Sequence, residues 1–362
     1  MHINELDTPA VLIDLEVLER NLRRAQEYLN EHGIRFRPHM KTHKIPQIGR
    51  MQVEFGAVGL TCAKIGEAEV MVDAGITDIF LAYPIWGEQK LKRLTALARR
   101  CRLTVAFDTW EVAEGISAEA RAEGLEINTL VEIDTGTGRC GVAPGPGLID
   151  FCRRVADLPG LNFQGLMTYQ GYIAGPRQQR EALMQEENDR LREIISDLQA
   201  AGLECPVVSG GTSPSLFFSH LLDSVNENRS GTYVFNDRNM VASQAATWSD
   251  CAMRIAVTVV SDAVHGQIII DGGSKTFSGD RCGAWEGYGR VVEDPDLLFL
   301  KMNEEHGYVR RNVSTQEHRV GERLHVIPNH VCTAMNMHDE VWVHRNGEVV
   351  DRWEIAARGK IR

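Results

Sequence analysis

Hydrophobic and polar residues alternate along the first two thirds of the chain in a strand–helix rhythm. A first apolar run, "AVLIDL" (10–15), precedes a segment in which Val17, Leu18 and Leu22 fall at helical spacing and which ends on Gly33. About eight such β-α units in some 240 residues predict a (β/α)8 barrel rather than an open sheet. The further predicted strands are "IRFRPH" (34–39), "AVGLTCA" (57–63), "DIFLAYP" (78–84), "CRLTVAFD" (101–108), "NTLVEID" (128–134), "FQGLMTY" (163–169) and "CPVVSGG" (205–211).

The pattern changes after about residue 245, where predicted strands are joined by turns and no long amphipathic helix occurs. The strand-like segments are 253–273, 322–332 and 339–360, and "HRNGEV" (344–349) is a hairpin signal. The sequence therefore predicts two domains, a barrel over 8–245 and a mostly β C-terminal domain over 246–362 together with residues 1–7.

Composition and charge narrow the class of protein. The 362 residues carry a net charge of -11, which disfavours binding to nucleic acid or to an anionic membrane. No apolar run approaches the roughly 20 residues of a membrane helix, and the first residues lack the features of a secretory signal. The eight cysteines are scattered without a C-x-x-C pair, which is typical of reduced thiols. We therefore expect a cytoplasmic protein.

The basic stretch "RFRPHMKTHK" (35–44) follows a predicted strand of the barrel. Chemistry in a barrel lies at the carboxyl ends of the strands, so Lys41 is placed to reach the barrel mouth. A lysine there can act as a Schiff-base nucleophile if burial or cationic neighbours lower its pKa, and Arg37, His39 and His43 could be those neighbours. The alternatives are a solvated basic turn, or Lys44 in the same role.

Two glycine-rich loops follow predicted strands of the barrel. In "VSGGTSPS" (208–215), glycines and hydroxyl side chains favour a phosphate-binding loop, although a tight turn with a helix cap uses the same residues. In "EIDTGTGRCGV" (132–142), Arg139 is placed at the same rim, with a structural contact to a loop carbonyl as the alternative. Asp134 of this loop fits a structural role. A lysine and a phosphate loop together favour a phosphorylated carbonyl cofactor.

The segment "NHVC" (329–332) places His330 and Cys332 two positions apart, on the same side of a predicted strand. Imidazole and thiolate suit Zn²⁺, and two ligands would leave coordination positions open for water or substrate. For an isolated pair of this kind, a buried cysteine beside a hydrogen-bonded histidine is the commoner arrangement.

Taken in order, "TPAVLIDLEVLERNL", "RPHMKTHK", "EIDTGTGRCGV", "SGGTSPS", "SGTYVFND" and "IPNHVC" resemble the D-threonine aldolase / D-serine dehydratase-like family. These are pyridoxal-phosphate enzymes of fold type III with an alanine-racemase-like barrel. The resemblance extends from about residue 5 to the end of the chain. It implies a homodimer that acts on a small D-amino acid and has no nucleic-acid or membrane partner.

The resemblance also implies roles for particular residues. Lys41 matches the lysine that forms the Schiff base with pyridoxal phosphate, and Arg139 matches the arginine that contacts the cofactor's phenolic oxygen. His330 and Cys332 match a divalent-metal pair that would hold the substrate's 3-hydroxyl beside the cofactor. Zn²⁺ is the expected metal, and Mn²⁺ or Mg²⁺ are alternatives. The residues that match the cofactor-binding region are Tyr169, Gly210, Gly211, Thr212 and Tyr233.

Two lyase reactions fit such a site, and we favour the first. Loss of the Cα proton and the 3-hydroxyl gives dehydration and then deamination, as for D-serine or D-threo-3-hydroxyaspartate. Cleavage of Cα–Cβ gives glycine and an aldehyde. The H-x-C pair resembles the dehydratase branch, and "TYQGYIAGPRQQ" (168–179) lacks the histidine that aldolases tend to carry. The remaining alternatives are a racemase, a non-catalytic pyridoxal-phosphate-binding protein and a sugar-phosphate barrel enzyme.

Overall fold

The computed structural model describes residues 1–173, 175, 177–311 and 316–362 and divides into two compact units. The barrel unit combines 24–41, 46–231 and 360–362, and the β-rich unit combines 1–23, 42–45 and 232–359. The predicted barrel domain extended over 8–245. The structure gives both ends of that range, and the short segment 42–45, to the β-rich unit.

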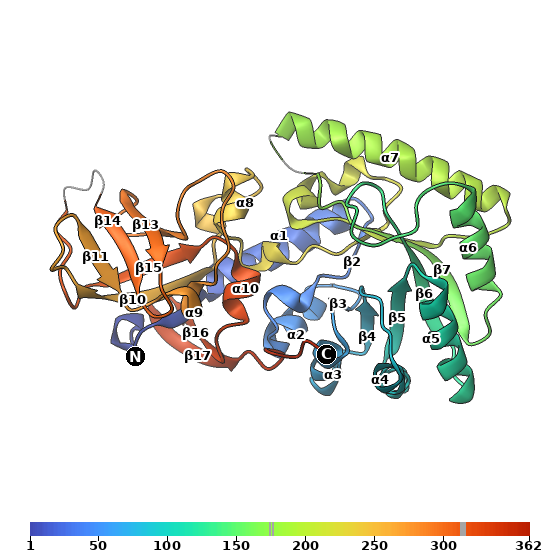
Figure 1. The fold of residues 1–362 in the computed structure, drawn as a ribbon, viewed down its shortest axis with the longest axis horizontal. Coiled ribbons are helices and arrows are strands. Elements are labelled where there is room, and N and C mark those ends of the chain that lie inside the picture. Colours follow the sequence, from blue (N-terminus) through green and yellow to red (C-terminus); the bar gives the residue numbers. More distant parts are fainter. Residues whose placement is uncertain (174, 176, 312–315) are drawn as a thin grey trace. The chain divides into compact units, whose positions relative to one another are not determined.

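The barrel unit is built on eight parallel strands in the order β2-β9-β8-β7-β6-β5-β4-β3. A bridge between His39 and Thr61, with Thr61 N donating to Pro38 O at 2.9 Å, joins the two edge strands. The predicted (β/α)8 barrel is therefore confirmed (Figure 1). The strands are β2 (Arg35–Phe36), β3 (Leu60–Cys62), β4 (Asp78–Leu81), β5 (Arg102–Phe107), β6 (Ile127–Ile133), β7 (Leu161–Thr168), β8 (Val207–Gly210) and β9 (Glu227–Asn228).

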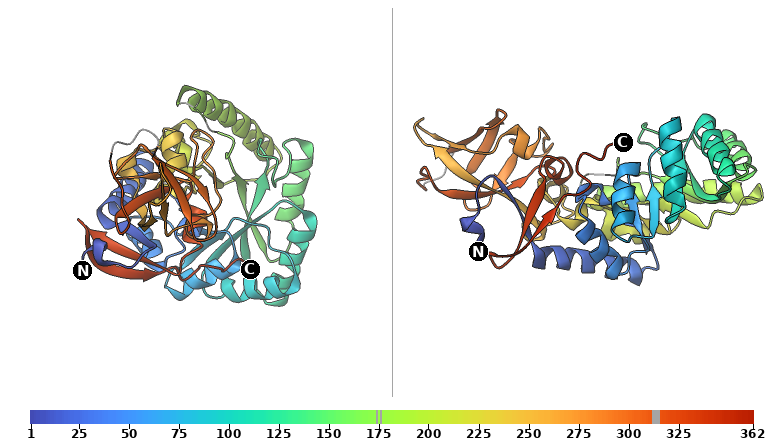
Figure 2. Two further views of the ribbon diagram at one scale, coloured as in Figure 1. Left: turned by 60° about the vertical axis from the view of Figure 1, so that its left-hand side comes forward. Right: turned by 90° about the horizontal axis from the view of Figure 1, so that it is seen from below.

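Helices follow the barrel strands and bury one face each. In α5, Val112, Ala113, Ile116 and Ala120 are buried, which is the helical spacing that an amphipathic segment presents to a sheet. The left view of Figure 2 shows the light-blue to green helices along the outer side of the curved sheet. The helices are α2 (Pro46–Glu54), α3 (Ile65–Asp73), α4 (Glu88–Ala98), α5 (Trp110–Ala122), α6 (Pro146–Ala156), α7 (Arg177–Ala200) and the 3-10 helix η3 (Ser213–Leu221).

The first predicted barrel strand lies elsewhere. Strand β1 (Ala10–Asp14) pairs antiparallel with β10 (Met253–Ser261) and parallel with β16 (Glu340–Arg345), in the β-rich unit. Its first four residues are all buried, so its sequence has the same apolar run as a barrel strand. The eighth barrel strand is β9, whose two residues are too few to give a periodic signal.

The β-rich unit is a nine-stranded sheet that includes β1. Its terminal hairpin turns through Asn346 and Gly347, both with positive φ (49° and 84°), which confirms the predicted hairpin. The remaining strands are β11 (Gln267–Ile270), β12 (Gly289–Val291), β13 (Leu297–Met302), β14 (Gly307–Arg311), β15 (Arg323–Pro328) and β17 (Glu348–Glu354). The short helices are η1 (Ile3–Glu5), η4 (Thr232–Val234), α8 (Arg238–Ala242), η5 (Trp248–Asp250), α9 (Ser274–Phe277) and α10 (Val331–Met335).

Helix α1 (Leu15–Glu31) contributes its first residues to the β-rich unit and the rest to the barrel unit. None of the helices in the described part of the chain combines the length and the hydropathy that a membrane-spanning segment requires.

Candidate active site

Lys41 lies in the 3-10 helix η2 (Met40–Thr42), immediately beyond strand β2 of the barrel. Its backbone N donates to His39 Nδ1 at 3.4 Å. Arg37, one of the predicted cationic neighbours, is instead held in a buried ion-pair network with Asp78 (2.5 Å) and Glu227 (3.0 Å). Two carboxylates compensate its charge, so Arg37 is part of a paired network in the barrel interior.

In the loop after β8, the two predicted phosphate-binding glycines make close contacts within the protein. Gly211 has φ 87°, and its N–H donates to Gln170 Oε1 at 2.7 Å. A Cβ at this position would lie 2.4 Å from Asn228 Nδ2. The glycine is therefore required by the packing of the loop, and its N–H already has a protein acceptor. A Cβ at Gly210 would likewise come too close to the side chain of Gln170.

The ends of strands β8 and β9 also carry side-chain hydroxyl groups that could bind a phosphate. Thr212 Oγ1 and Ser215 Oγ are 2.9 Å apart, and a 3-10 helix rather than an α-helix follows. Strand β9 pairs with β8, and Ser230 follows β9. Ser230 Oγ is buried and has no hydrogen-bond partner. An unpartnered buried polar group costs about 1–3 kcal/mol, which a bound acceptor would recover.

These observations test whether the edge fits a phosphate-bearing cofactor. Arg229 N donates to Gly210 O at 2.9 Å, so the loops that follow β8 and β9 lie side by side. The two loops offer the hydroxyls of Thr212 and Ser230 at neighbouring strand ends. The donor chemistry therefore fits a phosphate group. The sequence argument missed Ser230, although "RSGTY" (229–233) is a second Ser-Gly segment that could have been found.

Arg139 and Tyr169 meet on the loops that follow β6 and β7. The Arg139 guanidinium lies 4.6 Å from the centroid of the Tyr169 ring and 3.6 Å from Glu132 Oε1. Burial raises the pKa of Glu132, and the charge of Arg139 opposes that shift. Asp134 accepts hydrogen bonds from the backbone N–H groups of Gly136 and Gly138, which lower its pKa and make it part of the loop structure.

His330 and Cys332 are not on a strand, so that part of the prediction is wrong. Strand β15 ends at Pro328, His330 is the N-cap of α10, and Cys332 is in its first turn. His330 Nδ1 lies 3.0 Å from Asp237 Oδ2. Burial disfavours the charged imidazole, but hydrogen bonds to Asp237 and Cys332 raise the pKa of His330 to about 11. The two side chains are thus neighbours although the strand premise fails.

Asp237 holds the histidine, and the sequence argument missed it. Its carboxylate is fully buried, and it also accepts the N–H of Val331 at 3.1 Å and the N–H of Met240 at 2.9 Å. A carboxylate that accepts from Nδ1–H fixes the tautomer in which Nε2 can bind a metal once the metal displaces its proton. The sequence signal is weak, because Asp237 lies 93 positions before His330.

The Cys332 thiol is surrounded by hydroxyl groups. Thr42 Oγ1 is 3.2 Å and Thr232 Oγ1 is 3.9 Å from Cys332 Sγ, and Thr42 directly follows Lys41 in the chain. Across the described ranges no set of three or more His, Cys, Asp or Glu side chains is placed to hold a metal ion. Imidazole and thiolate would fit a borderline-soft metal with the other positions open.

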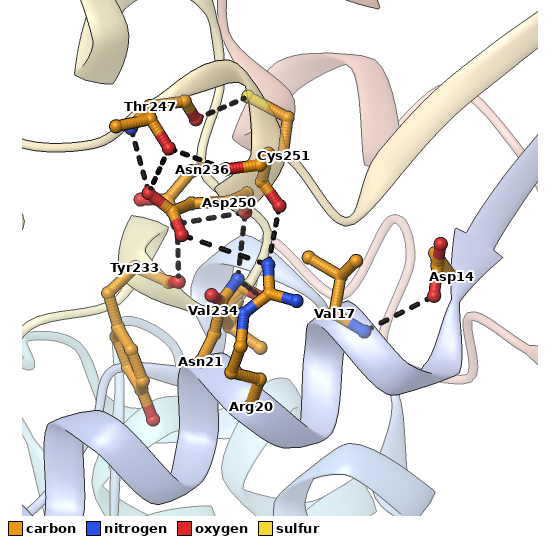
Figure 3. Close-up of polar contacts among 11 residues, drawn as sticks. Asp14, Val17, Arg20, Asn21, Tyr233, Val234, Asn236, Thr247, Asp250 and Cys251 are labelled. Carbon is orange, nitrogen blue, oxygen red and sulfur yellow. Dashed lines mark hydrogen bonds and ion pairs between the residues drawn. The ribbon is translucent and has the colours of Figure 1, made fainter.

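Tyr233, predicted to bind the cofactor phosphate, lies in η4 on a backbone that polar contacts hold in place. Asn236 Nδ2 donates to Tyr233 O at 3.1 Å and to Asp250 O at 3.1 Å. Asn21 Nδ2 donates to Val234 O at 3.2 Å. Figure 3 shows that the Tyr233 side chain points away from these contacts. These contacts therefore fix the backbone of η4 at Tyr233.

Two family models match the chain. "Alanine racemase, N-terminal domain" matches residues 13–239, and "Putative serine dehydratase domain" matches residues 252–344. D-threonine aldolase from Arthrobacter sp is 33% identical over 361 residues, covering 98% of this chain and 93% of that protein. D-threo-3-hydroxyaspartate dehydratase from Delftia sp. (strain HT23) is 34% identical over 347 residues, covering 90% and 91%.

The crystal structure of D-threonine aldolase from Filomicrobium marinum superimposes with a TM-score of 0.93 at 33% identity, over 99% of this chain and 98% of that one. A metal-free cysteine-to-alanine mutant of D-threo-3-hydroxyaspartate dehydratase matches with a TM-score of 0.90 at 31% identity, over 98% of each chain. These relatives are pyridoxal-phosphate-dependent lyases. The chain therefore belongs to the D-threonine aldolase / D-serine dehydratase-like family of pyridoxal-phosphate enzymes with an alanine-racemase-like fold.

Proposed function

We propose that this lyase is a metal-dependent dehydratase of D-3-hydroxy-amino acids, of the D-serine or D-threo-3-hydroxyaspartate type. The observation that carries the proposal is the His330–Cys332 pair with Asp237 behind the imidazole. The related D-threo-3-hydroxyaspartate dehydratase has been studied as a histidine mutant and as a cysteine mutant two positions later, the second in a metal-free form. That spacing equals the spacing of His330 and Cys332.

Each part of the chain has a separate task in this proposal. Lys41 would bind the aldehyde carbon of pyridoxal phosphate, Arg139 would contact its phenolic oxygen, and Thr212 and Ser230 would donate to its phosphate. The cofactor, when bound, supplies an electron sink that weakens the bonds at the substrate Cα. His330 and Cys332 bind a divalent metal, with Zn²⁺ as the expected ion, which supplies a Lewis acid for the substrate's 3-hydroxyl.

Retro-aldol cleavage is the second candidate, because D-threonine aldolases match the chain over almost its whole length. Cleavage of Cα–Cβ requires a base for the 3-hydroxyl. The segment after Tyr169 carries no histidine, and the hydroxyl of Tyr172 donates to Glu187 at 2.6 Å. Burial raises the pKa of Tyr172, and the hydrogen bond to Glu187 acts in the same direction, so this phenol does not replace the missing base at neutral pH.

One assay distinguishes the two reactions. The holoenzyme with added metal is incubated separately with D-serine, D-threonine and D-threo-3-hydroxyaspartate. A 2-oxo acid and ammonia in equal amounts would support the dehydratase, whereas glycine and an aldehyde would show the aldolase. If none of these products forms while the amino acid loses its optical activity, the protein is a racemase and the proposal is wrong.

Ser230→Ala is expected to weaken the binding of pyridoxal phosphate about tenfold, because it removes a hydrogen bond to a charged group. The Tm of the cofactor-free protein should stay the same or rise, since this hydroxyl has no protein partner. Titration of the apoprotein, followed by absorbance, measures the affinity. Ser117→Ala is the matched control, because the Ser117 hydroxyl donates to Pro159 O at 2.7 Å, so the Tm should fall while cofactor affinity stays unchanged.

Asp237→Asn is expected to lower metal affinity by about 10- to 100-fold, because an amide no longer fixes the imidazole tautomer. The asparagine oxygen can still accept from Met240 N, so α8 should keep its cap. Asp294→Asn is the control, because it changes another Asp–His pair of the β-rich unit, at 3.0 Å from His318. Equal metal affinity in both variants, measured by competition with a chelator, would contradict the role of Asp237.

A further inference from the structure

A cavity of about 300 Å³ opens in the β-rich unit, apart from the residues assigned above to cofactor and metal. Its charged and aromatic lining consists of Arg238, Arg290, Glu286, Trp248, Trp285 and Phe299, and Pro295 and Leu298 add apolar surface. These residues come from α8, η5, β12, β13 and the loops before and after β12. Nothing in the proposed reaction uses this cavity.

The two arginines and two tryptophans form a four-layer stack. The Arg290 guanidinium lies 4.2 Å from the ring centroid of Trp248, and the indoles of Trp248 and Trp285 stack at 5.6 Å with an interplanar angle of 24°. The Arg238 guanidinium lies 5.5 Å from the Trp285 ring. Stacking occupies a face of each guanidinium and leaves the N–H edges to bind acceptors.

Hydrogen bonds fix the Arg238 end of the stack. Arg238 Nη1 donates to Asn329 Oδ1 at 3.0 Å, and Nη2 donates to Glu286 O at 2.7 Å. The Arg238 residue is only 8% exposed. One wall of the cavity is thus preorganised by buried polar contacts, which lowers the entropy cost of binding a ligand there.

The cavity has an excess of positive charge, because two arginines and one carboxylate, Glu286, line it. Arg238 is hydrogen-bonded to the backbone carbonyl of Glu286. Burial lowers the pKa of Arg238, the neighbouring Cys282 opposes that shift, and the positive charge of Arg290 adds to it. An anion in the cavity would offset two unfavourable effects, the burial of the Arg238 charge and the repulsion between Arg238 and Arg290. The cavity is therefore suited to an anionic ligand.

We propose that this cavity binds a small organic carboxylate, with its anionic group on the edges of Arg238 and Arg290 and its apolar body against Pro295 and Leu298. The apolar lining excludes a bare inorganic anion as the best fit, because such an ion would leave that surface in contact with water. The site is distinct from the proposed metal pair, although Asn329, which holds Arg238, directly precedes His330 in the chain.

Calorimetric titration of the holoenzyme with benzoate tests the proposal, with benzamide as a neutral ligand of the same shape. We expect one benzoate per chain, weaker binding at higher salt, and binding of benzamide at least about tenfold weaker than that of benzoate. Absence of benzoate binding, or equal binding of both ligands, would overturn the proposal.

Arg290→Met locates the ligand. The methionine keeps apolar contact with Trp248 and removes the charge, so benzoate affinity should fall about tenfold or more while the Tm changes little. Arg352→Met is the matched control. Arg352 also lies over an indole, 5.5 Å from the Trp342 ring, but it is exposed and lies 3.5 Å from Glu340. Benzoate affinity that is lost equally in both variants, or retained in Arg290→Met, would contradict the assignment.

Two further measurements test whether benzoate binds at the candidate active site instead, and whether this surface is an interface between copies of the chain. Lys41→Ala should bind benzoate like the wild type, and loss of binding there would place benzoate at the candidate active site instead. Light scattering should give the same mass for wild type and Arg290→Met. A lower mass for Arg290→Met, together with no benzoate binding by the wild type, would show that the surface joins copies of the chain.

Discussion

Lys41→Ala is expected to abolish turnover and the visible absorbance of bound cofactor, which for a lysine-bound pyridoxal phosphate lies at about 420 nm. The variant loses the amine proposed to bind the cofactor aldehyde, and Lys44 is the one other lysine in the segment 37–45 between β2 and α2. Spectra recorded after reconstitution with pyridoxal phosphate, together with product assays, measure both effects. The noncovalent contacts of Thr212 and Ser230 should still retain some cofactor.

Lys44→Ala provides the comparison, because Lys44 is close in sequence and buried, at 7% exposed. Its backbone has φ 57°, and its carbonyl accepts from Ala357 N at 3.1 Å, so the chain turns there. The Lys44→Ala variant should keep the absorbance band, and its positive φ adds no strain because lysine and alanine both carry a Cβ. A band that is lost in Lys44→Ala and kept in Lys41→Ala would reverse the assignment.

Removal of the metal is expected to have the second large effect. Chelation, or Cys332→Ala, should reduce activity on D-3-hydroxy-amino acids about 100-fold or more, because hydroxide is a poor leaving group without a Lewis acid. The protein should stay folded and keep its cofactor, since neither the Lys41 linkage nor the barrel depends on the pair. Metal analysis beside turnover, before and after chelation, measures this.

Two cysteine variants sharpen the test. Cys332→Asp supplies an oxygen ligand and should retain part of the metal and activity. Cys152→Ala should leave both unchanged, because burial in α6 raises the pKa of Cys152 to about 12 and keeps it a neutral thiol. Full activity in a metal-free preparation would remove the metal from the mechanism and leave His330 and Cys332 as packing residues.

The alternation of strand-like and helix-like segments was sufficient to predict the barrel and the β-rich C-terminal part. The spacing of hydrophobic residues and the positions of turns are properties of short segments of sequence. The position of Lys41 past a barrel strand and the hairpin at Asn346 and Gly347 were readable for the same reason. The order of motifs also identified the family, which the comparisons confirm. Each of these features depends on residues close together in the sequence.

The tertiary structure decided the features that depend on distant partners. Strand β1 has the apolar run of a barrel strand, but its backbone pairs with β10 and β16, and pairing partners leave no mark on a single segment. Arg37 looked like a cationic neighbour of Lys41 until Asp78 and Glu227 were seen to compensate it. A charge acts on a catalytic group only if no nearer carboxylate neutralises it.

The two supporting residues of the candidate site were out of reach of the sequence for the same physical reason. Asp237 meets His330 across 93 positions, and Ser230 matters because its hydroxyl is buried without a partner. Burial and hydrogen-bond satisfaction are properties of the packed chain. The sequence by itself determined the fold class, the family and the candidate side chains, and the fold decided which neighbours hold or neutralise them, because distance in space sets electrostatic and hydrogen-bond energies.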